Sequence, residues 1–317
     1  MINYAQLLNR EPFTPTHGAL SAALEGKTVL ITGGGGSIGS ELALLVMDYS
    51  PKKLIIADRC EGNLFNIGQR LEIEGKIRNV ALVIADVCDA SNIGALFESK
   101  VDIVFHAAAY KHVPLLEDCF PKAYFNNVIG TEIPANEAIK TGAGKFVMIS
   151  TDKAVNPKSI MGQTKRSAEK HIQSKSDSDT DFSIVRFGNV IGSSGSVTTI
   201  WDRQIAAGKP ITVTDPNMTR YFITLREAAM LVLHTVTMEG NGDVFLLDMG
   251  EPINMLDLAK DYLAMVGSDA EIKIIGTRPG EKVHEELHYA NEQKSNTQYD
   301  KIWRLTREVK KQNDEAG

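Results

Sequence analysis

The sequence predicts an α/β protein in which helices cover both faces of a doubly wound parallel sheet, joined to a smaller C-terminal lobe. From Lys27 onward, short apolar runs of strand length alternate with amphipathic windows of helical spacing, an order typical of parallel strands joined by helices. The chain has 317 residues, enough to bury a large core and to form two lobes that share a cleft.

The composition argues against several classes of function. The formal net charge of −6 argues against nonspecific nucleic-acid binding, which needs clustered cations. No apolar run approaches the roughly 18 residues of a membrane span, and Met1 to Arg10 lacks the charged-then-apolar order of a signal peptide. The three cysteines, Cys60, Cys88 and Cys119, are widely spaced, so we expect reduced thiols and a cytoplasmic protein.

The elements follow in chain order. Residues 1–26 are mixed and turn-rich, which predicts an arm rather than a core element. Residues 27–192 are expected to form the main domain, with elements shared from the C-terminal half. Apolar runs predict strands at 28–32, 53–58, 80–85, 101–106, 145–150 and 182–187, and amphipathic windows predict helices at 37–49, 61–74, 90–100, 123–141 and 161–174.

The second half begins at a glycine-serine stretch, 193–196, which marks the entry to the smaller lobe at 193–290. Helices at 224–238 and 254–266 flank a strand at 244–248, and Thr224 and Asn254 are suited to cap them. Residues 291–317 are expected to form a tail that is polar and disordered after Thr306.

The first predicted strand ends in a glycine-rich turn, TGGGGSIG, that opens a helix. Glycines permit a tight turn, a close approach of backbone to a pyrophosphate and close packing of helix on strand, while the helix N-terminus offers unpaired N–H groups to the anion. This Rossmann-type pattern predicts a dinucleotide site formed by Gly33, Gly36, Ser37, Ile38 and Gly39.

Two further strand ends carry carboxylates. Asp58 follows the glycine turn by about 20 residues, at a strand end where an acid accepts ribose hydroxyls. It favours NAD, because a carboxylate repels a 2′-phosphate, whereas the adjacent Arg59 leaves NADP open. Asp86 and Val87 end the third strand, where a carboxylate can meet the adenine amino group; a solvated strand end is the alternative for Asp86.

The fourth strand runs into small residues. Ala107, Ala108 and Ala109 would let a flat ligand lie against the backbone, and Lys111 then becomes a candidate anion clamp. His106 and His112 have no evident partner in the sequence and are interpreted as structural.

A pair of amides lies in the next helical window. Asn126 and Asn127 are not favoured in helices, which suggests a polar role facing the cleft. Buried amides whose hydrogen bonds are satisfied inside the protein are the competing interpretation.

The stretch STDK follows the apolar run 145–149, so Thr151, Asp152 and Lys153 are expected at the carboxyl end of a parallel strand, where open α/β sheets bind their ligands. Met161 and Lys165 stand four residues apart on one face of the next helix. A hydroxyl, an acid and two ammonium groups therefore converge on one place. The alternative is a polar strand end beside a solvated lysine helix.

With these residues in hand, the chain resembles the extended short-chain dehydrogenase/reductase family and, within it, the CapD-like nucleotide-sugar 4,6-dehydratases. The resemblance covers roughly residues 27–290 and rests on TGGGGSIGSEL, HAAAYKHVPLLE, STDKAVNP, MGQTKRSAEK, VRFGNVIGSSGSV, MTRYFIT and RPGEKVHEEL. It implies a UDP-sugar substrate, UDP-N-acetylglucosamine, a nicotinamide cofactor recycled in each turnover, and a homodimer or hexamer. Many members are membrane-anchored, so the chain is expected to be a soluble member or the soluble domain of an anchored one.

One departure from the wider family concerns proton transfer. Short-chain dehydrogenases usually carry YxxxK, and here Met161 stands in the tyrosine position, four residues before Lys165. A thioether cannot transfer a proton, so another group must take the proton of the C4 hydroxyl. The resemblance includes a branch with methionine at this position, which looks closer to dehydratases that retain the configuration at C5.

The resemblance also implies roles for the STDK residues. Asp152 would act as general acid at the C6 hydroxyl and Lys153 as general base at C5, after hydride leaves C4 for NAD⁺; hydride then returns to C6. Thr151 would orient the C4 hydroxyl, and Lys165 would hold the nicotinamide ribose and help drain the C4 proton. This chemistry needs a neutral lysine and a protonated aspartic acid, which a dry site favours.

The smaller lobe is implied to bind the substrate. A guanidinium suits a diphosphate and a carboxylate suits a ribose diol, which agrees with the implied roles of Arg278 and Glu281. Arg220 is a second cationic candidate, with a surface role as its alternative. The further implied contacts are Asn189, Ser194, Gly195, Ser196, Val197, Thr198 and Thr212.

Three alternatives remain open. His284 to His288 matches HExxH, a zinc motif, but it lies inside the RPGEKVHEEL stretch without a clear third ligand, so we expect no metal. A C5-inverting dehydratase or a UDP-sugar 4-epimerase would use the same scaffold, although the Asp152–Lys153 pair argues against simple epimerisation. A noncatalytic dinucleotide-binding regulatory module would bind cofactor without turnover.

Overall fold

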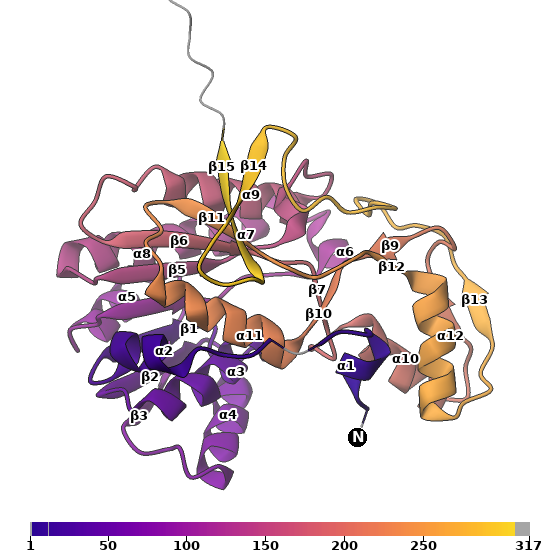
Figure 1. Cartoon of the computed structure of the whole chain (residues 1–317), viewed down its shortest axis with the longest axis horizontal. Coiled ribbons are helices and arrows are strands. Elements are labelled where there is room, and N and C mark those ends of the chain that lie inside the picture. The colour runs from indigo at the N-terminus through magenta and orange to yellow at the C-terminus, as the bar shows by residue number, and fades with distance from the viewer. Residues whose placement is uncertain (1, 12, 308–317) are drawn as a thin grey trace, which may run out of the picture.

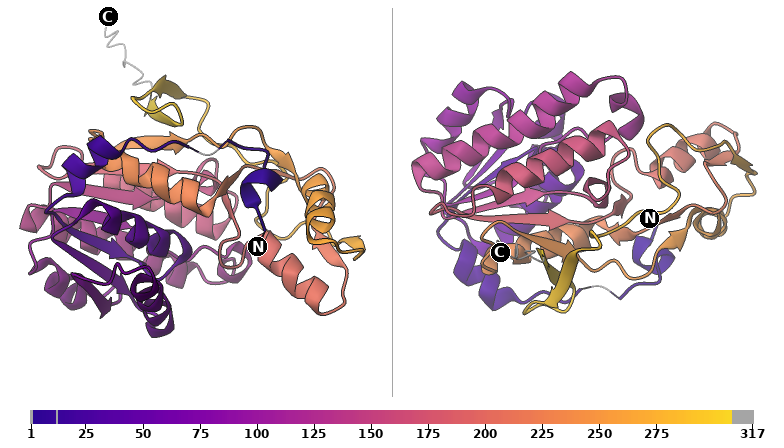
Figure 2. Two further views of the ribbon diagram at one scale, coloured as in Figure 1. Left: turned by 60° about the horizontal axis from the view of Figure 1, so that its bottom comes forward. Right: turned by 90° about the horizontal axis from the view of Figure 1, so that it is seen from above.

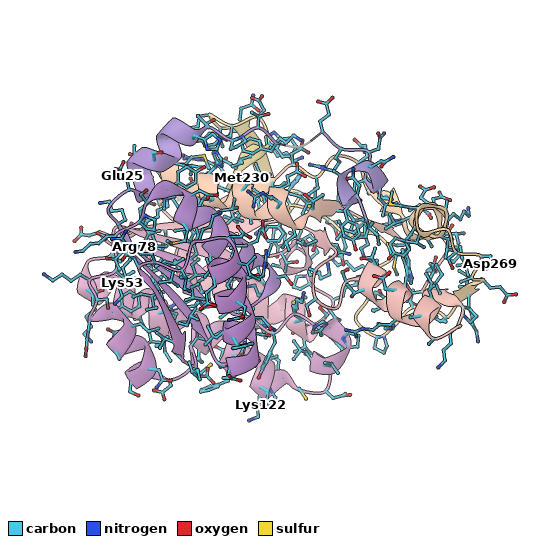
Figure 3. The ribbon with its side chains drawn as sticks, turned by 90° about the horizontal axis from the view of Figure 1, so that it is seen from below. Glu25, Lys53, Arg78, Lys122, Met230 and Asp269 are labelled. Atoms are coloured by element: carbon cyan, nitrogen blue, oxygen red, sulfur yellow. The ribbon has the colours of Figure 1, made fainter. Side chains whose placement is uncertain are left out.

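The computed structural model describes residues 2–11 and 13–307, which form a large lobe around one sheet and a smaller lobe beside it (Figure 1). Figure 3 shows the separation of the lobes, with Asp269 at the far end of the smaller one and Lys53 and Arg78 at the opposite end of the large one. Among the described residues, no helix combines the length and apolarity needed to cross a membrane.

The large lobe contains a nine-stranded sheet in the order β14-β15-β11-β6-β5-β4-β1-β2-β3. The strands from β3 to β11 in this order run parallel, β15 runs antiparallel to β11, and β14 runs antiparallel to β15. Their bounds are β1 Thr28–Thr32, β2 Lys53–Asp58, β3 Val80–Ile84, β4 Ile103–His106, β5 Lys145–Ile149, β6 Asp181–Arg186, β11 Asp243–Leu247, β14 Glu292–Asn296 and β15 Ile302–Arg307.

Successive residues of the central strands are buried on opposite faces of the sheet. In β1, Val29 and Ile31 join one apolar cluster and Leu30 joins the other. Helices therefore cover both faces, as Figure 2 shows, and the predicted doubly wound α/β fold is confirmed. One layer contains α2 His17–Leu24, α3 Ser37–Val46, α4 Glu61–Ile73 and α11 Leu225–His234, and the other contains α5 Ala90–Phe97, α8 Gly130–Thr141 and α9 Ile160–Gln173.

The smaller lobe has its own core around Trp201 and Tyr262, which are fully buried. Thr224 and Asn254 cap their helices as predicted, since each side chain accepts hydrogen bonds from backbone N–H groups of the first turn. The elements of this lobe and its junction are α1 Tyr4–Leu7, β7 Asn189–Ile191, α10 Val197–Ala206, β8 Ile211–Val213, β9 Thr219–Arg220, β10 Phe222–Thr224, β12 Ile253–Asn254, α12 Met255–Val266 and β13 Ile272–Ile274.

Both chain ends differ from the sequence prediction. Leu20 and Leu24 of α2 are fully buried in the core of the large lobe, so the arm contributes a core element after all. The expected tail instead forms the β14-β15 hairpin, which extends the sheet because Ile302 and Leu305 point into its two cores. The prediction of disorder falls mainly on 308–317, which lie outside the described residues.

The predicted helix at 123–141 is also interrupted. A short helix, α7 Phe120–Tyr124, passes through a π-helical turn at Phe125–Ile129 before α8 begins. The wider turn contains Asn126 and Asn127, which are both buried, and such turns often accompany functional sites.

Candidate active site at the carboxyl ends of the strands

The strand order reverses at β1, which pairs with β2 on one side and β4 on the other. Crevices in open α/β sheets form at such a point, outside the carboxyl ends of the strands. The glycine-rich turn after β1, the alanines after β4 and the STDK stretch after β5 therefore share one edge of the sheet.

The glycine turn fits a pyrophosphate. Gly33 has a φ of +65°, and a Cβ there would lie 2.6 Å from the Cα of Ala108, so only glycine is accommodated. The helix α3 begins after Gly36 with no side chain capping its N-terminus, which leaves backbone N–H groups for an anion. Ser37, Ile38 and Gly39 form its first turn.

Asp58 ends β2 beside this turn. Its carboxylate accepts hydrogen bonds from the backbone N–H groups of Gly35 and Cys60, at 3.1 and 2.9 Å. Arg59 instead reaches across to the Asn126 side chain, at 3.1 Å, and lies 4.4 Å from the ring centre of Tyr110. The Asp58 carboxylate keeps further lone pairs that can accept the ribose hydroxyls of a nicotinamide dinucleotide, so the residues here fit such a cofactor.

The third and fourth strand ends complete this side of the crevice. The Asp86 carboxylate accepts from the Cys88 N–H at 2.9 Å, and Val87 is buried in the sheet core. Burial, together with the charge of Asp86, raises the pKa of the Cys88 thiol to about 11. Ala107, Ala108 and Ala109 follow β4 as predicted, with Ala107 and Ala108 next to Gly33.

Asn127 is a buried amide whose hydrogen bonds are satisfied inside the protein, which agrees with the competing interpretation. Its side chain bonds to both backbone groups of Tyr110, at 2.7 and 3.1 Å, and to the Thr164 hydroxyl at 3.0 Å. The Asn126 amide donates to Asn127 at 3.0 Å and accepts from Arg59. Both amides thus stabilise the backbone that follows β4, behind the crevice.

Lys111 connects the two lobes. Its ammonium donates to the Ser194 carbonyl at 2.7 Å, while the Ser194 N–H donates to the Ser37 hydroxyl at 3.0 Å. The Ser193–Ser196 loop therefore touches the glycine turn itself. Burial lowers the pKa of Lys111.

The STDK residues form a buried acid-base pair after β5. The Asp152 side chain is fully buried, and Lys153 Nζ lies 3.0 Å from Asp152 Oδ1 and 2.9 Å from Asn189 Oδ1. The Thr151 hydroxyl donates to the same Asp152 oxygen at 2.9 Å. Within the described part of the chain, Asp152 Oδ2 has no hydrogen-bond partner.

Lys165 and Met161 lie on α9, a helix that packs against the Asp152–Ala154 turn. Burial lowers the pKa of Lys165 to about 8, with the nearby Glu169 partly offsetting the effect, and its ammonium donates to the Ile149 carbonyl at 2.7 Å. Burial and the charge of Lys165 together lower the pKa of His106 to about 3, and its ring bonds to Thr32 and Thr131, which agrees with a structural histidine. Met161 packs in a small apolar cluster with Leu116 and Ala123.

A cavity of ≈ 150 Å³ lies between the acid-base pair and the smaller lobe. Arg220 is buried and donates to the carbonyls of Thr219, Lys282 and Val283, whereas Arg278 is exposed at the rim. The lining residues are Val113, Pro114, Lys153, Lys158, Ser159, Asn189, Arg220, Arg278, Gly280, Glu281, Lys282 and Glu285.

Sequence reasoning missed Lys158, Lys282 and Glu285 in this lining. Lys282 and Glu285 are buried, and Glu285 Oε1 lies 3.8 Å from Lys153 Nζ. No local pattern could identify Lys282 and Glu285, because they are far from Lys153 in the chain, whereas Lys158 lies only five residues after Lys153, in a loop without periodicity. The cations at this cavity give local positive charge in a chain whose net charge is −6.

Other predicted substrate contacts lie at the junction of the lobes. Thr198 is buried and bonds through its hydroxyl to Ser196 at 2.9 Å, and Val197 begins α10. Gly195 packs close to the His112 ring. Thr212 is bonded through its N–H and hydroxyl to Gln204, both at 3.0 Å, so these groups are already satisfied within the lobe.

The HExxH match has no helical geometry, because residues 284–288 form no helix. His284 bonds to the Thr219 hydroxyl, and His288 bonds to the Tyr289 carbonyl. Two imidazoles one helical turn apart, which the zinc motif requires, are therefore not formed. Among the residues that the structure describes, no group of three or more His, Cys, Asp or Glu is arranged to hold a metal.

A doubly wound sheet, a glycine-rich turn at the strand switch and a lysine on the helix after β5 define a short-chain dehydrogenase/reductase of the nucleotide-sugar dehydratase and epimerase type. The chain belongs to the family of polysaccharide biosynthesis proteins, whose family model matches residues 29–307.

Similar proteins agree with this assignment. The chain is 45% identical over 310 residues to the capsular polysaccharide biosynthesis protein CapD of Staphylococcus aureus, covering 96% of this chain and 52% of CapD. It is 44% identical to the probable polysaccharide biosynthesis protein EpsC of Bacillus subtilis (strain 168), covering 90% of this chain and 49% of EpsC. The chain thus spans about half the length of these curated relatives.

Among solved structures, Pen from Bacillus thuringiensis superposes with a TM-score of 0.83 at 33% identity, covering 90% of each chain. DesIV, the dTDP-glucose 4,6-dehydratase of Streptomyces venezuelae, shares the fold with a TM-score of 0.74 at 20% identity, covering 82% of this chain and 88% of its own. That structure contains NAD.

Proposed function

We propose that this chain dehydrates UDP-N-acetylglucosamine to UDP-2-acetamido-2,6-dideoxy-4-hexulose, with retained configuration at C5, in the synthesis of bacterial surface polysaccharide. The observation that carries the proposal is the buried Asp152–Lys153 pair, 3.0 Å apart at the strand end beside a cation-lined cavity. An acid and a base side by side suit the loss of water across C5 and C6. The names of CapD and EpsC support the polysaccharide pathway.

Asp152 is arranged to serve as the acid. Its Oδ1 already accepts from Thr151 and Lys153, so Oδ2 is the oxygen left to carry a proton toward the departing C6 hydroxyl. Thr151, next in sequence, would orient the C4 hydroxyl.

Lys153 is arranged to serve as the base. Its amine is fixed between Asp152 and Asn189, which fixes the direction from which it takes the C5 proton. After elimination, Lys153 carries the proton taken from C5 and Asp152 has lost its own. When hydride returns to C6, Lys153 would give a proton back to C5, after exchange with solvent when the solvent is D₂O, and the proton taken from the C4 hydroxyl would return to Asp152. The two protons removed from the sugar then balance the two delivered to it.

The cofactor side has residues that fit NAD. The glycine turn would hold the pyrophosphate, Asp58 the adenosine ribose and Lys165 the nicotinamide ribose. Bound NAD would supply the exchange of hydride, accepted from sugar C4 and returned at C6. Burial lowers the pKa of Lys165 to about 8, so this side chain can exchange a proton near neutral pH. It is therefore suited to accept the proton of the C4 hydroxyl in place of the missing tyrosine.

Proton NMR of the purified chain with UDP-N-acetylglucosamine in D₂O tests this function. We expect a new C6 methyl signal that has lost its coupling to H5, because deuterium enters at C5. The couplings among H1, H2 and H3 report the ring conformation and so separate retention from inversion at C5. An unchanged spectrum from protein shown to hold NAD contradicts the proposal and favours a noncatalytic binding module.

A UDP-sugar 4-epimerase is the second candidate. The observation that favours it is the 35% identity to the UDP-glucose 4-epimerase of Rickettsia canadensis, over 82% of this chain and 77% of that protein. Epimerisation inverts C4 without loss of water, so the same spectrum would show a changed H4 coupling and no methyl signal. It would leave the buried acid Asp152 without a step to perform.

A further inference from the structure

A buried carboxylate, Glu285, lines the cavity next to Lys153. The Glu285 side chain is 4% exposed and lines the cavity together with Lys153 and Asn189. Its Oε1 lies 3.8 Å from Lys153 Nζ, and its Oε2 lies 3.7 Å from Lys282 Nζ. Both contacts are longer than hydrogen bonds, so the carboxylate is near positive charge without being bonded to it.

Glu285 Oε2 belongs to a small set of orphaned atoms. In residues 2–11 and 13–307, five buried side-chain polar atoms have no hydrogen-bond partner. Only two of these are carboxylate oxygens, Asp152 Oδ2 and Glu285 Oε2, and they belong to the two acids that flank Lys153. Leaving a buried acceptor unpaired costs about 1–3 kcal/mol, so an unpaired oxygen on Glu285, which lines the cavity, indicates a carboxylate whose donor is missing.

The backbone that carries Glu285 is held rigidly. Arg220 donates to the carbonyls of Lys282 and Val283, at 2.8 and 3.0 Å, and Lys282 donates to the Val155 carbonyl at 2.8 Å. The Tyr289 hydroxyl donates to the Ala154 carbonyl at 2.9 Å. These bonds fix the segment against the STDK loop on both sides of Glu285, so the position of the carboxylate is set before any ligand arrives.

From this geometry we infer that Glu285 is a sugar-recognition residue, whose carboxylate accepts a hydrogen bond from a hydroxyl or amide N–H of the substrate sugar and fixes the ring against Lys153. The group must be a neutral donor, because a carboxylate repels the diphosphate. It must be on the sugar, because Glu285 adjoins the base that reaches C5. The inference rests on the proposed function, since it takes the substrate to be a UDP-sugar.

The test compares Glu285→Ala and Glu285→Gln with the wild type. We expect Glu285→Ala to raise the KM for UDP-N-acetylglucosamine, and to lower kcat/KM, by about 10- to 100-fold, the range for a hydrogen bond to a charged group. Inhibition by UDP, which lacks the sugar, should be unchanged. Glu285→Gln keeps an acceptor oxygen and should recover most of the loss.

Controls separate recognition from folding. Glu271→Ala, at an exposed carboxylate of the smaller lobe, should match the wild type in every measurement. NAD binding should be equal in all variants, and each should unfold in one cooperative transition above the assay temperature. The midpoint is expected to shift in Glu285→Ala, because that change removes a buried carboxylate with an unpaired oxygen. A Glu285→Ala enzyme with unchanged KM, or one that loses UDP and UDP-sugar affinity equally, overturns the inference and leaves the proposed function intact.

Failure of the proposed function gives a different result. If the wild type does not turn over the sugar, calorimetric titration with UDP-N-acetylglucosamine and with UDP becomes possible, because no substrate is consumed. A gain in affinity from the sugar that disappears in Glu285→Ala supports the inference without the reaction. No gain from the sugar in the wild type overturns it.

Discussion

Two groups of buried charge lie close together in this protein and differ in how completely they are paired. We call the first the structural cluster and the second the cavity cluster. The structural cluster consists of Arg166, Glu169, Arg186 and Glu292. The cavity cluster consists of Asp152, Lys153, Lys282 and Glu285.

In the structural cluster, Arg186 is enclosed by acids. It bonds to both oxygens of Glu169, each at 2.7 Å, and to Glu292 Oε2 at 2.7 Å, with all three side chains at most 1% exposed. Burial alone would raise the pKa of Glu169, but its bonds to Arg186 outweigh this and lower it. Burial would lower the pKa of Arg186, and the two acids raise it instead.

In the cavity cluster only the Asp152–Lys153 contact is a hydrogen bond, at 3.0 Å, and the ion pairs of Glu285 are 3.7 and 3.8 Å long. The two carboxylates each keep one unpaired oxygen. The comparison teaches that complete pairing accompanies a structural role, whereas incomplete pairing of buried carboxylates around the half-buried Lys153 marks the place where a substrate completes the set.

The largest expected effect comes from Lys153→Met. Removing the base while keeping the length of the side chain should lower turnover of UDP-N-acetylglucosamine by about 10⁴-fold or more, with NAD still bound. NMR detection of the C6 methyl product gives the measurement, and Lys170→Met, at an exposed lysine of α9, is the matched control. Dehydration at a normal rate in Lys153→Met would remove the lysine from the mechanism.

In the structural cluster, Arg186→Met should instead affect folding. Loss of the guanidinium removes the positive charge that is bonded to the buried carboxylates of Glu169 and Glu292, which is expected to lower the free energy of unfolding by roughly 3–5 kcal/mol. Thermal melting should show a fall on the order of 5–10 °C, whereas Arg203→Met, at an exposed arginine, should not change the melting temperature. Equal stability of Arg186→Met and wild type would show that complete pairing contributes nothing here.

Lys165 lies between the two clusters and should separate stability from activity. Burial lowers its pKa from 10.5 to about 8. Between these values the unfolded chain binds more protons than the folded one, so the free energy of unfolding of the wild type should rise with pH from about 8 to 10.5. The destabilisation caused by burying the charged lysine should be fully present below pH 8.

Lys165→Met removes that destabilisation. The variant should be more stable than the wild type by about 1–3 kcal/mol at pH 7, with the difference shrinking toward pH 10, while turnover falls. Urea denaturation at pH 7 and pH 10 gives the comparison. A variant that is less stable at both pH values would mean that the bond from Lys165 to the Ile149 carbonyl outweighs the burial of its charge.

The sequence predicted the parallel sheet, the glycine turn and the STDK stretch, because each is encoded by neighbouring residues. It did not predict the cavity cluster, because Glu285 and Lys282 reach Lys153 only through the path of the C-terminal half around the sheet. The β14-β15 hairpin was missed because an edge hairpin with one exposed face has a polar composition. A sequence also cannot show which carboxylate oxygens lack a hydrogen-bond partner, because this depends on the folded geometry.

The smallest effect is expected at Met161, and it tests whether the tyrosine position still takes part in the chemistry. Met161 is 3% exposed and packs with Leu116 and Ala123, in a cluster against which Tyr110, Val113 and Ile160 also pack. Met161→Leu conserves volume and should change the free energy of unfolding by less than about 1.5 kcal/mol and turnover by less than about threefold. Met161→Tyr adds volume and a hydroxyl to this apolar cluster, so it should lower stability by about 1–3 kcal/mol.

Steady-state turnover and thermal melting of the two variants decide the point. If Met161→Leu were inactive, the thioether itself would be needed at the site. If Met161→Tyr were faster than the wild type, a phenol would be the better acceptor of the C4 proton, and Lys165 would lose the part assigned to it. Equal turnover in the wild type and Met161→Leu leaves the polar groups around Lys153 as the source of the chemistry.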